Sequence, residues 1–133
     1  MKIGLCDDDK VWCDYAEKVI KAFAIKIEIN VEISVFQNKQ ELLQYEKAPM
    51  DVLFLDIELG EDNGIAIADE INKRWTGCQI VFLTNYLYYA LEIFQTDHIY
   101  YVLKEQFEER ISEVFNKIIH FFEQNNTKIS FRG

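Results

Sequence analysis

The sequence has little proline, little glycine and few histidines. Its 133 residues include one proline, five glycines and two histidines. No Gly/Ser-rich tract, low-complexity segment or internal repeat is present, so a linker between two domains is not expected. A chain of this size buries roughly two-thirds of its unfolded surface. With a hydrophobic fraction of 50%, the chain is expected to form one packed globular domain.

Long hydrophobic runs are also missing. No apolar run approaches the roughly 18 residues that a membrane-spanning helix requires. The opening stretch, MKIGLC, leads directly into acidic residues without a hydrophobic signal region or a cleavage site. We therefore expect a cytoplasmic chain without a membrane partner.

Basic residues are scarce relative to acidic ones. The chain has 14 lysines and arginines against 23 acidic residues, which gives a formal net charge of -9. Nucleic-acid binding depends on lysine and arginine side chains that neutralise phosphates, so this chain is not expected to bind DNA or RNA by itself. Part of the acidity can instead form a site for a cation.

Cysteine usage points to a reducing environment. Cys6, Cys13 and Cys78 are odd in number and scattered, without a C-x-x-C pair. This pattern predicts reduced, partly buried thiols rather than a disulfide framework or a metal site.

Strand-like and helix-like segments alternate along the chain. Apolar runs typical of strands cover Lys2–Cys6, Glu28–Phe36, Asp51–Leu55, Gln79–Leu83 and Ile99–Leu103. Helical periodicity follows each run, over Trp12–Phe23, from a cap at Asn38, over Gly64–Trp75, over Tyr86–Gln95 and over Phe107–Phe122. This alternation predicts an α/β protein with a parallel sheet and helices on both faces.

The polarity of each run predicts where its strand lies in the sheet. The runs IGLC, VLFL and IVFL are apolar at successive positions, as interior parallel strands are. Glu28–Phe36 alternates between apolar and polar residues, which indicates an edge strand. A doubly wound (βα)5 sheet of order 2-1-3-4-5 satisfies these patterns. Such a sheet binds its ligand beyond the carboxyl ends of strands 1 and 3.

Chemically active residues follow the predicted strands. Asp7 and Asp8 follow the first strand, Asp56 the third, Thr84 the fourth and Lys104 the fifth. In a parallel sheet all of these positions lie at one edge. We therefore expect three carboxylates, a hydroxyl and an ammonium to converge there.

The three carboxylates suggest a magnesium site. Adjacent carboxylates repel one another, and Mg²⁺ binds through hard oxygen ligands such as these. Asp56, alone on the central strand, is a candidate nucleophile toward phosphorus. A simpler explanation exists for each feature, because acids before a helix stabilise its N-terminus and single strand-end residues are often structural. Asp9 fits the role of a helix start or of a residue that supports the metal ligands without binding the metal.

These residues resemble the receiver domain of bacterial two-component response regulators. The matching pieces are the acid pair in CDDD, the aspartate in VLFLDIEL, the hydroxyl residue in IVFLTN, the lysine in YYVLK and Gly64. The resemblance covers the chain to about residue 124 and implies a CheY-like, flavodoxin-like fold.

The resemblance implies a metal site and a phosphoacceptor. Asp8 would bind Mg²⁺ directly, and Asp7 directly or through water. Asp56 would take the phosphoryl group from a sensor histidine kinase and contribute to the metal site, which the carbonyl group of Glu58 would complete. The chain would then be a phosphoacceptor in signalling rather than an enzyme.

The resemblance also implies a switch. Thr84 and Lys104 would hold the phosphoryl oxygens, and Tyr101 would turn inward when Thr84 moves. The surface of the fourth helix, fifth strand and fifth helix would then change, and a homodimer could form there. The aromatic residues Tyr86, Tyr88, Tyr89 and Phe94 of the fourth helix favour such an interface.

Within the family, CDDD and YYALEIFQ most resemble receivers that control a LytTR-type DNA-binding domain. We therefore expect a receiver domain over residues 1–125. The tail at 126–133, which includes KISFRG, would begin a C-terminal DNA-binding domain involved in transcription regulation. DNA would be contacted only through that domain.

Two residues depart from the family pattern. Glu105 replaces the proline that usually follows the lysine, so we expect a different loop path and an extra negative charge beside the phosphoryl pocket. Asn85 follows the threonine where a small residue is common, which would narrow access to Asp56.

Three other functions remain open from the sequence. The chain could be an interaction module that keeps the receiver fold without phosphorylation. It could be an aspartate-based phosphatase resembling the haloacid dehalogenase group, although that group has D-x-D where this chain has DIE and usually carries a cap domain. A flavodoxin-like cofactor binder is disfavoured, because three acids would repel the cofactor phosphate.

Overall fold

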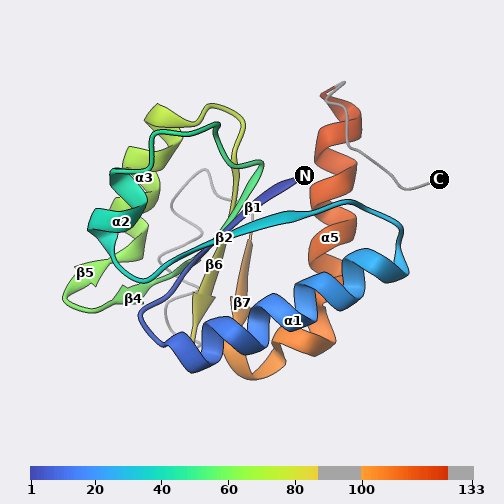
Figure 1. Ribbon diagram of the computed structural model, residues 1–133, viewed down its shortest axis with the longest axis horizontal. Coiled ribbons are helices and arrows are strands. Elements are labelled where there is room, and N and C mark those ends of the chain that lie inside the picture. Colours follow the sequence, from blue (N-terminus) through green and yellow to red (C-terminus); the bar gives the residue numbers. More distant parts are fainter. Residues whose placement is uncertain (87–99, 126–133) are drawn as a thin grey trace.

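The computed structural model describes residues 1–86 and 100–125 (Figure 1). The main elements are β1 (Lys2–Cys6), α1 (Lys10–Lys26), β2 (Glu32–Phe36), α2 (Lys39–Leu43), β3 (Val52–Asp56), α3 (Gly64–Arg74), β6 (Gln79–Thr84), β7 (Tyr100–Leu103) and α5 (Phe107–Gln124). The loop after β3 contains two short strands, β4 (Glu58–Leu59) and β5 (Asp62–Asn63), and a 3-10 helix covers Lys104–Gln106.

The five long strands form one parallel sheet in the order β2-β1-β3-β6-β7. This order confirms the predicted 2-1-3-4-5, because β4 and β5 form a separate antiparallel hairpin. Helices α2 and α3 lie on one side of the sheet, and α1 and α5 lie on the other (Figure 1). The doubly wound arrangement is therefore confirmed for these four helices.

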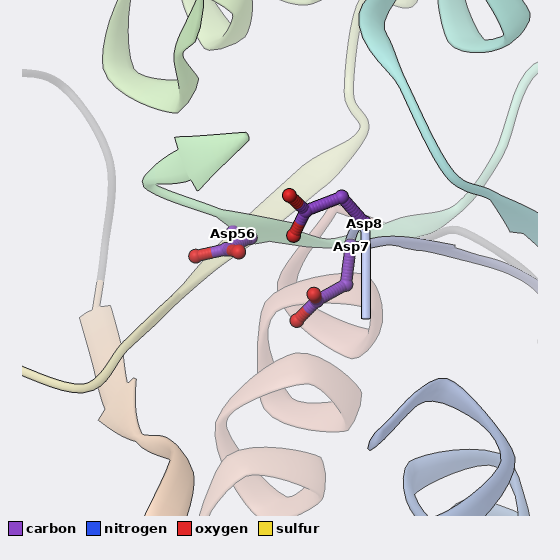
Figure 2. A group of neighbouring side chains, drawn as sticks. All are labelled: Asp7, Asp8 and Asp56. Atoms are coloured by element: carbon purple, nitrogen blue, oxygen red, sulfur yellow. The ribbon is translucent and has the colours of Figure 1, made fainter. Parts of the chain in front are cut away.

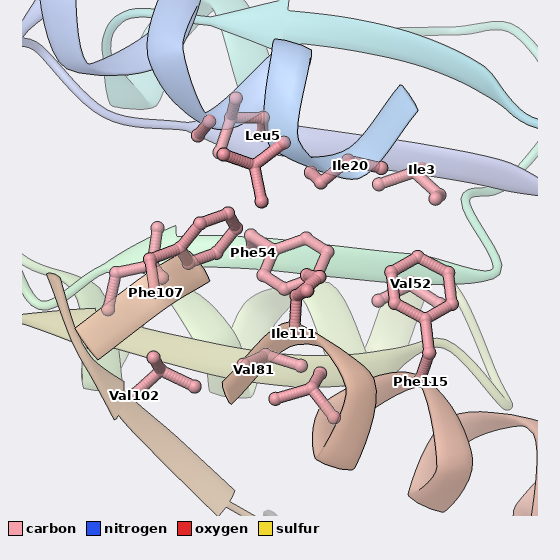
Figure 3. Packing of buried hydrophobic residues seen from close by; sticks show 14 of the residues in the cluster. Ile3, Leu5, Ile20, Val52, Phe54, Val81, Val102, Phe107, Ile111 and Phe115 are labelled. Carbon is pink, nitrogen blue, oxygen red and sulfur yellow. The ribbon is translucent and has the colours of Figure 1, made fainter. Parts of the chain in front are cut away.

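The two faces of the sheet each have their own hydrophobic core. Every residue of β3 is buried, and successive side chains point to opposite faces. Val52 and Phe54 pack with α1 and α5, as Figure 3 shows, whereas Leu53 and Leu55 pack with α2 and α3. The unbroken apolar runs in the sequence therefore correspond to strands covered on both faces.

Side-chain caps start the first two helices where the sequence predicts them. The Asp9 carboxylate accepts a hydrogen bond from the Trp12 amide at 3.2 Å and caps α1. The Asn38 side chain accepts from the Glu41 amide at 2.8 Å and caps α2. These bonds satisfy amides that have no partner inside the helix.

The second strand is shorter than predicted. The prediction for Glu28–Phe36 was wrong over its first four residues, because β2 begins only at Glu32. Helix α1 runs to Lys26, and Glu28 has a φ of 60° in the turn that follows. The alternating pattern in this segment arises partly because the turn buries Ile29 completely.

Several smaller expectations can also be judged. The hairpin of β4 and β5 was not predicted for the acidic loop. Cys6, Cys13 and Cys78 are buried free thiols, as expected.

Most of the predicted helix over Tyr86–Gln95 lies outside the described residues, and so does the tail at 126–133. No helix in the described ranges has the length and apolarity needed to cross a membrane.

Candidate functional site

Three carboxylates gather at the carboxyl edge of the sheet. Asp7 and Asp8 lie in the loop between β1 and α1, and Asp56 ends β3 (Figure 2). One oxygen atom from each residue lies within 4.8 Å of the corresponding atoms of the other two. Asp7 is completely buried, Asp56 is 4% exposed and Asp8 is exposed. Neighbouring strands therefore bring together the acids that the sequence singled out.

Backbone amides orient the two buried carboxylates. Asp7 Oδ1 accepts a hydrogen bond from the Asp9 amide at 2.9 Å. Asp56 Oδ1 accepts from the Glu58 amide at 3.1 Å. Each carboxylate thus has one oxygen held by the loop that follows it, while its other oxygen faces Lys104.

Gly64 allows α3 to start against the backbone of β3. Its amide donates to the Ile57 carbonyl at 2.7 Å. A Cβ atom at this position would lie 2.2 Å from the carbonyl oxygen of Asp56, which is too close for any side chain. Glycine is therefore required because α3 begins so close to the acidic site.

Lys104 pairs with both buried carboxylates. Its Nζ atom lies 2.6 Å from Asp7 Oδ2 and 3.3 Å from Asp56 Oδ2, and its side chain is 9% exposed. Burial alone lowers the pKa of Lys104, but the two carboxylates outweigh it and raise the pKa above its ordinary value. Lys104 is therefore a charged ammonium held between two acids.

One lysine does not fully compensate two buried acids. Burial, followed by the charge of Asp7, raises the pKa of Asp56 from 3.8 to about 7, although Lys104 and the Glu58 amide act in the opposite direction. A divalent cation would favour the ionised carboxylates. Clustered, hard oxygen donors of this kind fit Mg²⁺ chemically.

Thr84 is buried at the end of β6, with 1% of its surface exposed. Its hydroxyl accepts a hydrogen bond from the Tyr86 amide at 3.0 Å and donates to the Tyr86 carbonyl at 3.3 Å. The hydroxyl is thus engaged in the turn after β6 while the residue lines the pocket.

A polar pocket of about 290 Å³ opens over Asp56. It is lined by Asp8, Asp9, Asp56, Glu58, Gly60, Thr84, Asn85 and Lys104. Asn85 lies in the wall, at the position where narrowed access was expected. That Asp9 and Gly60 also line the pocket was not predicted. Their positions depend on how the loops that follow β1 and β3 fold over the edge of the sheet.

Glu105 is not among the residues that line the pocket, although it directly follows Lys104, which is. Lys104 begins a 3-10 turn that leads directly into α5, and Glu105 is exposed within that turn. The different loop path and the effect of the Glu105 charge on the phosphoryl pocket stay predictions.

Tyr101 also lies apart from the pocket lining. It is half-buried on β7 and packs against the core on the α2 and α3 side. The guanidinium group of Arg110 lies 5.9 Å from the centre of its ring, and Arg110 Nη1 donates to the Tyr101 carbonyl at 3.1 Å. The contact with Arg110 was not predicted.

Comparison with known proteins identifies one family. The family model of the response regulator receiver domain matches residues 3–116. The sensory transduction protein LytT of Bacillus anthracis is 34% identical over 117 residues, which are 88% of this chain and 46% of LytT. The chain therefore spans about half the length of this curated relative.

Solved structures give the same result. The response regulatory domain of mrkE from Klebsiella pneumoniae is 26% identical, with a TM-score of 0.76 over 93% of this chain and 99% of that domain. The response regulator TrrA from Thermotoga maritima was solved in complex with Mg(2+)-BeF. It is 24% identical, with a TM-score of 0.69 over 88% of this chain and 97% of TrrA. This similarity supports the fold alone. The chain belongs to the response regulator receiver domain family.

Proposed function

We propose that Asp56 accepts a phosphoryl group from a sensor histidine kinase and that this modification switches an output. The observation that carries the proposal is the position of Asp56 in a polar pocket that Asp8, Thr84 and Lys104 also line. In the transfer, an Asp56 carboxylate oxygen bonds to phosphorus, and the phosphorus–nitrogen bond to the kinase histidine breaks. The nitrogen keeps the electron pair.

The metal would be held by Asp8, Asp56 and the carbonyl group of Glu58. Asp7 would act through water, because its oxygens already contact the Asp9 amide and the Lys104 ammonium. Bound Mg²⁺ supplies positive charge that neutralises phosphoryl oxygens. Asp56 Oδ1 stays oriented by the Glu58 amide, which leaves Oδ2 to react.

Two residues would respond to the new charge. The Lys104 ammonium would exchange a carboxylate for a phosphoryl oxygen. The Thr84 hydroxyl would give up its 3.3 Å bond to the Tyr86 carbonyl and donate to another phosphoryl oxygen. Tyr101 would then change position, which would alter the surface around β7 and α5. This change would favour a homodimer through that surface and the helix predicted from the sequence over Tyr86–Gln95.

The output that we propose is transcription regulation. LytT is described as a sensory transduction protein and is about twice as long as this chain. A receiver over residues 1–125, followed by a LytTR-type DNA-binding domain that begins in the tail at 126–133, would fit that length. The receiver itself would act as a phosphoacceptor and not as an enzyme on external substrates.

The test uses acetyl phosphate as a phosphoryl donor in the presence of Mg²⁺. The wild-type chain is expected to gain one hydroxylamine-sensitive phosphoryl group, measured by intact mass spectrometry. Asp56→Asn should gain none, whereas the control Asp69→Asn, which removes an exposed acid of α3, should behave as wild type. Equal labelling of Asp56→Asn and wild type would refute the assignment.

The interaction-module hypothesis gives a different result in the same experiment. A wild-type chain that gains no phosphoryl group and binds no beryllofluoride with Mg²⁺ would support a receiver fold that acts without phosphorylation. Steady hydrolysis of a generic phosphate ester would instead support the aspartate-based phosphatase.

A further inference from the structure

The ammonium group of Lys104 has an aromatic neighbour as well as two acidic ones. Its Nζ atom lies 5.0 Å from the centre of the Trp12 ring. The same atom lies 2.6 Å from Asp7 Oδ2 and 3.3 Å from Asp56 Oδ2. A cation at this distance from an indole face is attracted by the negative face of the ring. Lys104 is therefore held by two carboxylates and by Trp12.

The Trp12 ring packs against one buried ring, which in turn packs against a second. Trp12 packs edge-on against Phe107, with ring centres 5.2 Å apart and an interplanar angle of 72°. Phe107 packs in the same way on Phe54 at 5.7 Å. Both phenylalanines are fully buried. Phe54 precedes Asp56 by two residues and Phe107 follows Lys104 by three, so these contacts link Trp12 to the segments that carry both site residues.

We propose that Trp12 is a positioning residue for Lys104 in the phosphoryl-transfer site, a role that rests on the proposed function of Asp56. The ring attracts the ammonium group without adding a negative charge. It therefore does not repel an incoming phosphoryl oxygen, as a third carboxylate would. The half-buried indole also shields the ammonium from water, which strengthens the pairing of Lys104 with an anion.

The proposal predicts different effects on metal and anion binding. Mg²⁺ competes with Lys104 for the carboxylates, so a less constrained lysine should not weaken Mg²⁺ binding. Beryllofluoride, a phosphoryl analogue, requires Lys104 as a partner. Trp12→Leu should therefore weaken beryllofluoride binding in saturating Mg²⁺ by about three- to thirty-fold, the range expected for a cation–π contact. Its affinity for Mg²⁺ alone should not fall.

The binding experiment compares wild type, Trp12→Leu, Trp12→Met and Trp12→Phe by calorimetry. Trp12→Phe keeps an aromatic face and should retain most of the wild-type affinity for beryllofluoride. Trp12→Met keeps an apolar side chain without a ring and provides a second variant if Trp12→Leu fails to fold. Trp75→Phe is the matched control, because Trp75 is buried on the other face of the sheet beside Tyr45.

A second measurement tests the contact independently of phosphorylation. The ring current of Trp12 should shift the Lys104 methylene protons next to Nζ upfield in the NMR spectrum of the metal-free chain. The shift should disappear in Trp12→Leu, persist in part in Trp12→Phe and be unchanged in Trp75→Phe. Absence of the shift in wild type would overturn the proposal.

The outcomes separate this role from ordinary packing and from the proposed function. Equal loss of Mg²⁺ and beryllofluoride affinity in the non-aromatic variants would mean that Trp12 only supports the fold. Equal affinities in Trp12→Leu and wild type would also overturn the role. A wild-type chain that binds no beryllofluoride would refute the function of Asp56 and the role of Trp12 together, even if the upfield shift were present.

Discussion

At the scale of single residues, the buried acids of the site are only partly neutralised. Asp7 and Asp56 share the Lys104 ammonium, and Asp8 adds a third carboxylate at the exposed side. Burial makes the repulsion between the acids stronger than it would be in water. The stability of the chain should therefore depend on divalent cations and on pH.

The first prediction concerns Mg²⁺. At about 100 times its dissociation constant, a ligand that binds only the folded state stabilises it by about 2.7 kcal/mol. We expect Mg²⁺ to raise the melting temperature of wild type and of the control Asp69→Asn, measured by differential scanning calorimetry. Asp56→Asn should lose most of this increase, because it lacks one of the three carboxylates. An undiminished increase in Asp56→Asn would place the metal elsewhere.

The second prediction concerns pH in the absence of metal. The folded-state pKa of Asp56 is raised from 3.8 to about 7, so its contribution to stability is complete below pH 4 and is lost as the pH rises toward 7. Asp56→Asn has no carboxyl group at this position, so its stability does not fall in this way as the pH rises. It should therefore be more stable than wild type by about 1–3 kcal/mol at pH 8, and the difference should shrink at pH 5.

Urea unfolding at the two pH values measures this difference. Asp69→Asn removes an exposed carboxylate and should follow the wild-type pH dependence. If Asp56→Asn is less stable than wild type at pH 8, the ion pair with Lys104 outweighs the repulsion from Asp7.

At the scale of elements, parallel strands bring the site residues together, and the loops after them orient the side chains. The start of α3 lies against the end of β3, because Gly64, the first residue of α3, has no side chain to keep the two backbones apart. The hairpin of β4 and β5 follows Asp56 and supplies the Glu58 amide that holds it. The geometry at Asp56 therefore depends on how closely α3 and the hairpin pack on β3.

The third prediction tests this close approach. Gly64→Ala would place a Cβ atom 2.2 Å from the Asp56 carbonyl oxygen, so the start of α3 must move. Forced overpacking of this kind costs about 1–3 kcal/mol, which urea unfolding would detect. Phosphorylation by acetyl phosphate should also slow, because the displaced loop carries the Glu58 amide.

Gly60→Ala is the comparison for this variant. Gly60 has a φ of 63°, but no atom outside Gly60 and its two chain neighbours lies within 4 Å of the position that an added methyl group would occupy. This variant should lose about 1 kcal/mol through backbone strain alone. Gly64→Ala with a smaller effect than Gly60→Ala would contradict the steric explanation.

At the scale of the whole molecule, the net charge of -9 sets limits on binding. The family model of the receiver domain matches residues 3–116, and Asp8 and Asp56 line the pocket at the carboxyl edge. The remaining acidity would repel polyanions from this chain. We therefore do not expect this chain alone to bind DNA.

The fourth prediction follows from this charge. Residues 1–133 should show no binding to duplex DNA in an electrophoretic mobility assay at physiological salt, with or without acetyl phosphate. A longer chain that continues into a DNA-binding domain should bind. Salt-sensitive binding by residues 1–133 alone would show that a local basic surface overrides the net charge.

Much of this molecule can be predicted from local sequence patterns. Period-two and continuous apolar runs identify the strands, and side-chain caps at Asp9 and Asn38 mark helix starts. The order of the strands then follows from which runs are apolar throughout. Since parallel strands end at one edge, the convergence of Asp7, Asp56 and Lys104 also follows from the sequence.

Other features depend on contacts between residues far apart in the chain. Asp56 and Lys104 are separated by 48 positions, and the pKa of Asp56 depends on their distance and on burial. The exposure of Glu105 depends on the 3-10 turn before α5, and the contact of Trp12 with Lys104 depends on how α1 packs against Phe107. Local patterns specify which residues form each element, whereas distances, burial and charge coupling arise only when the elements pack together.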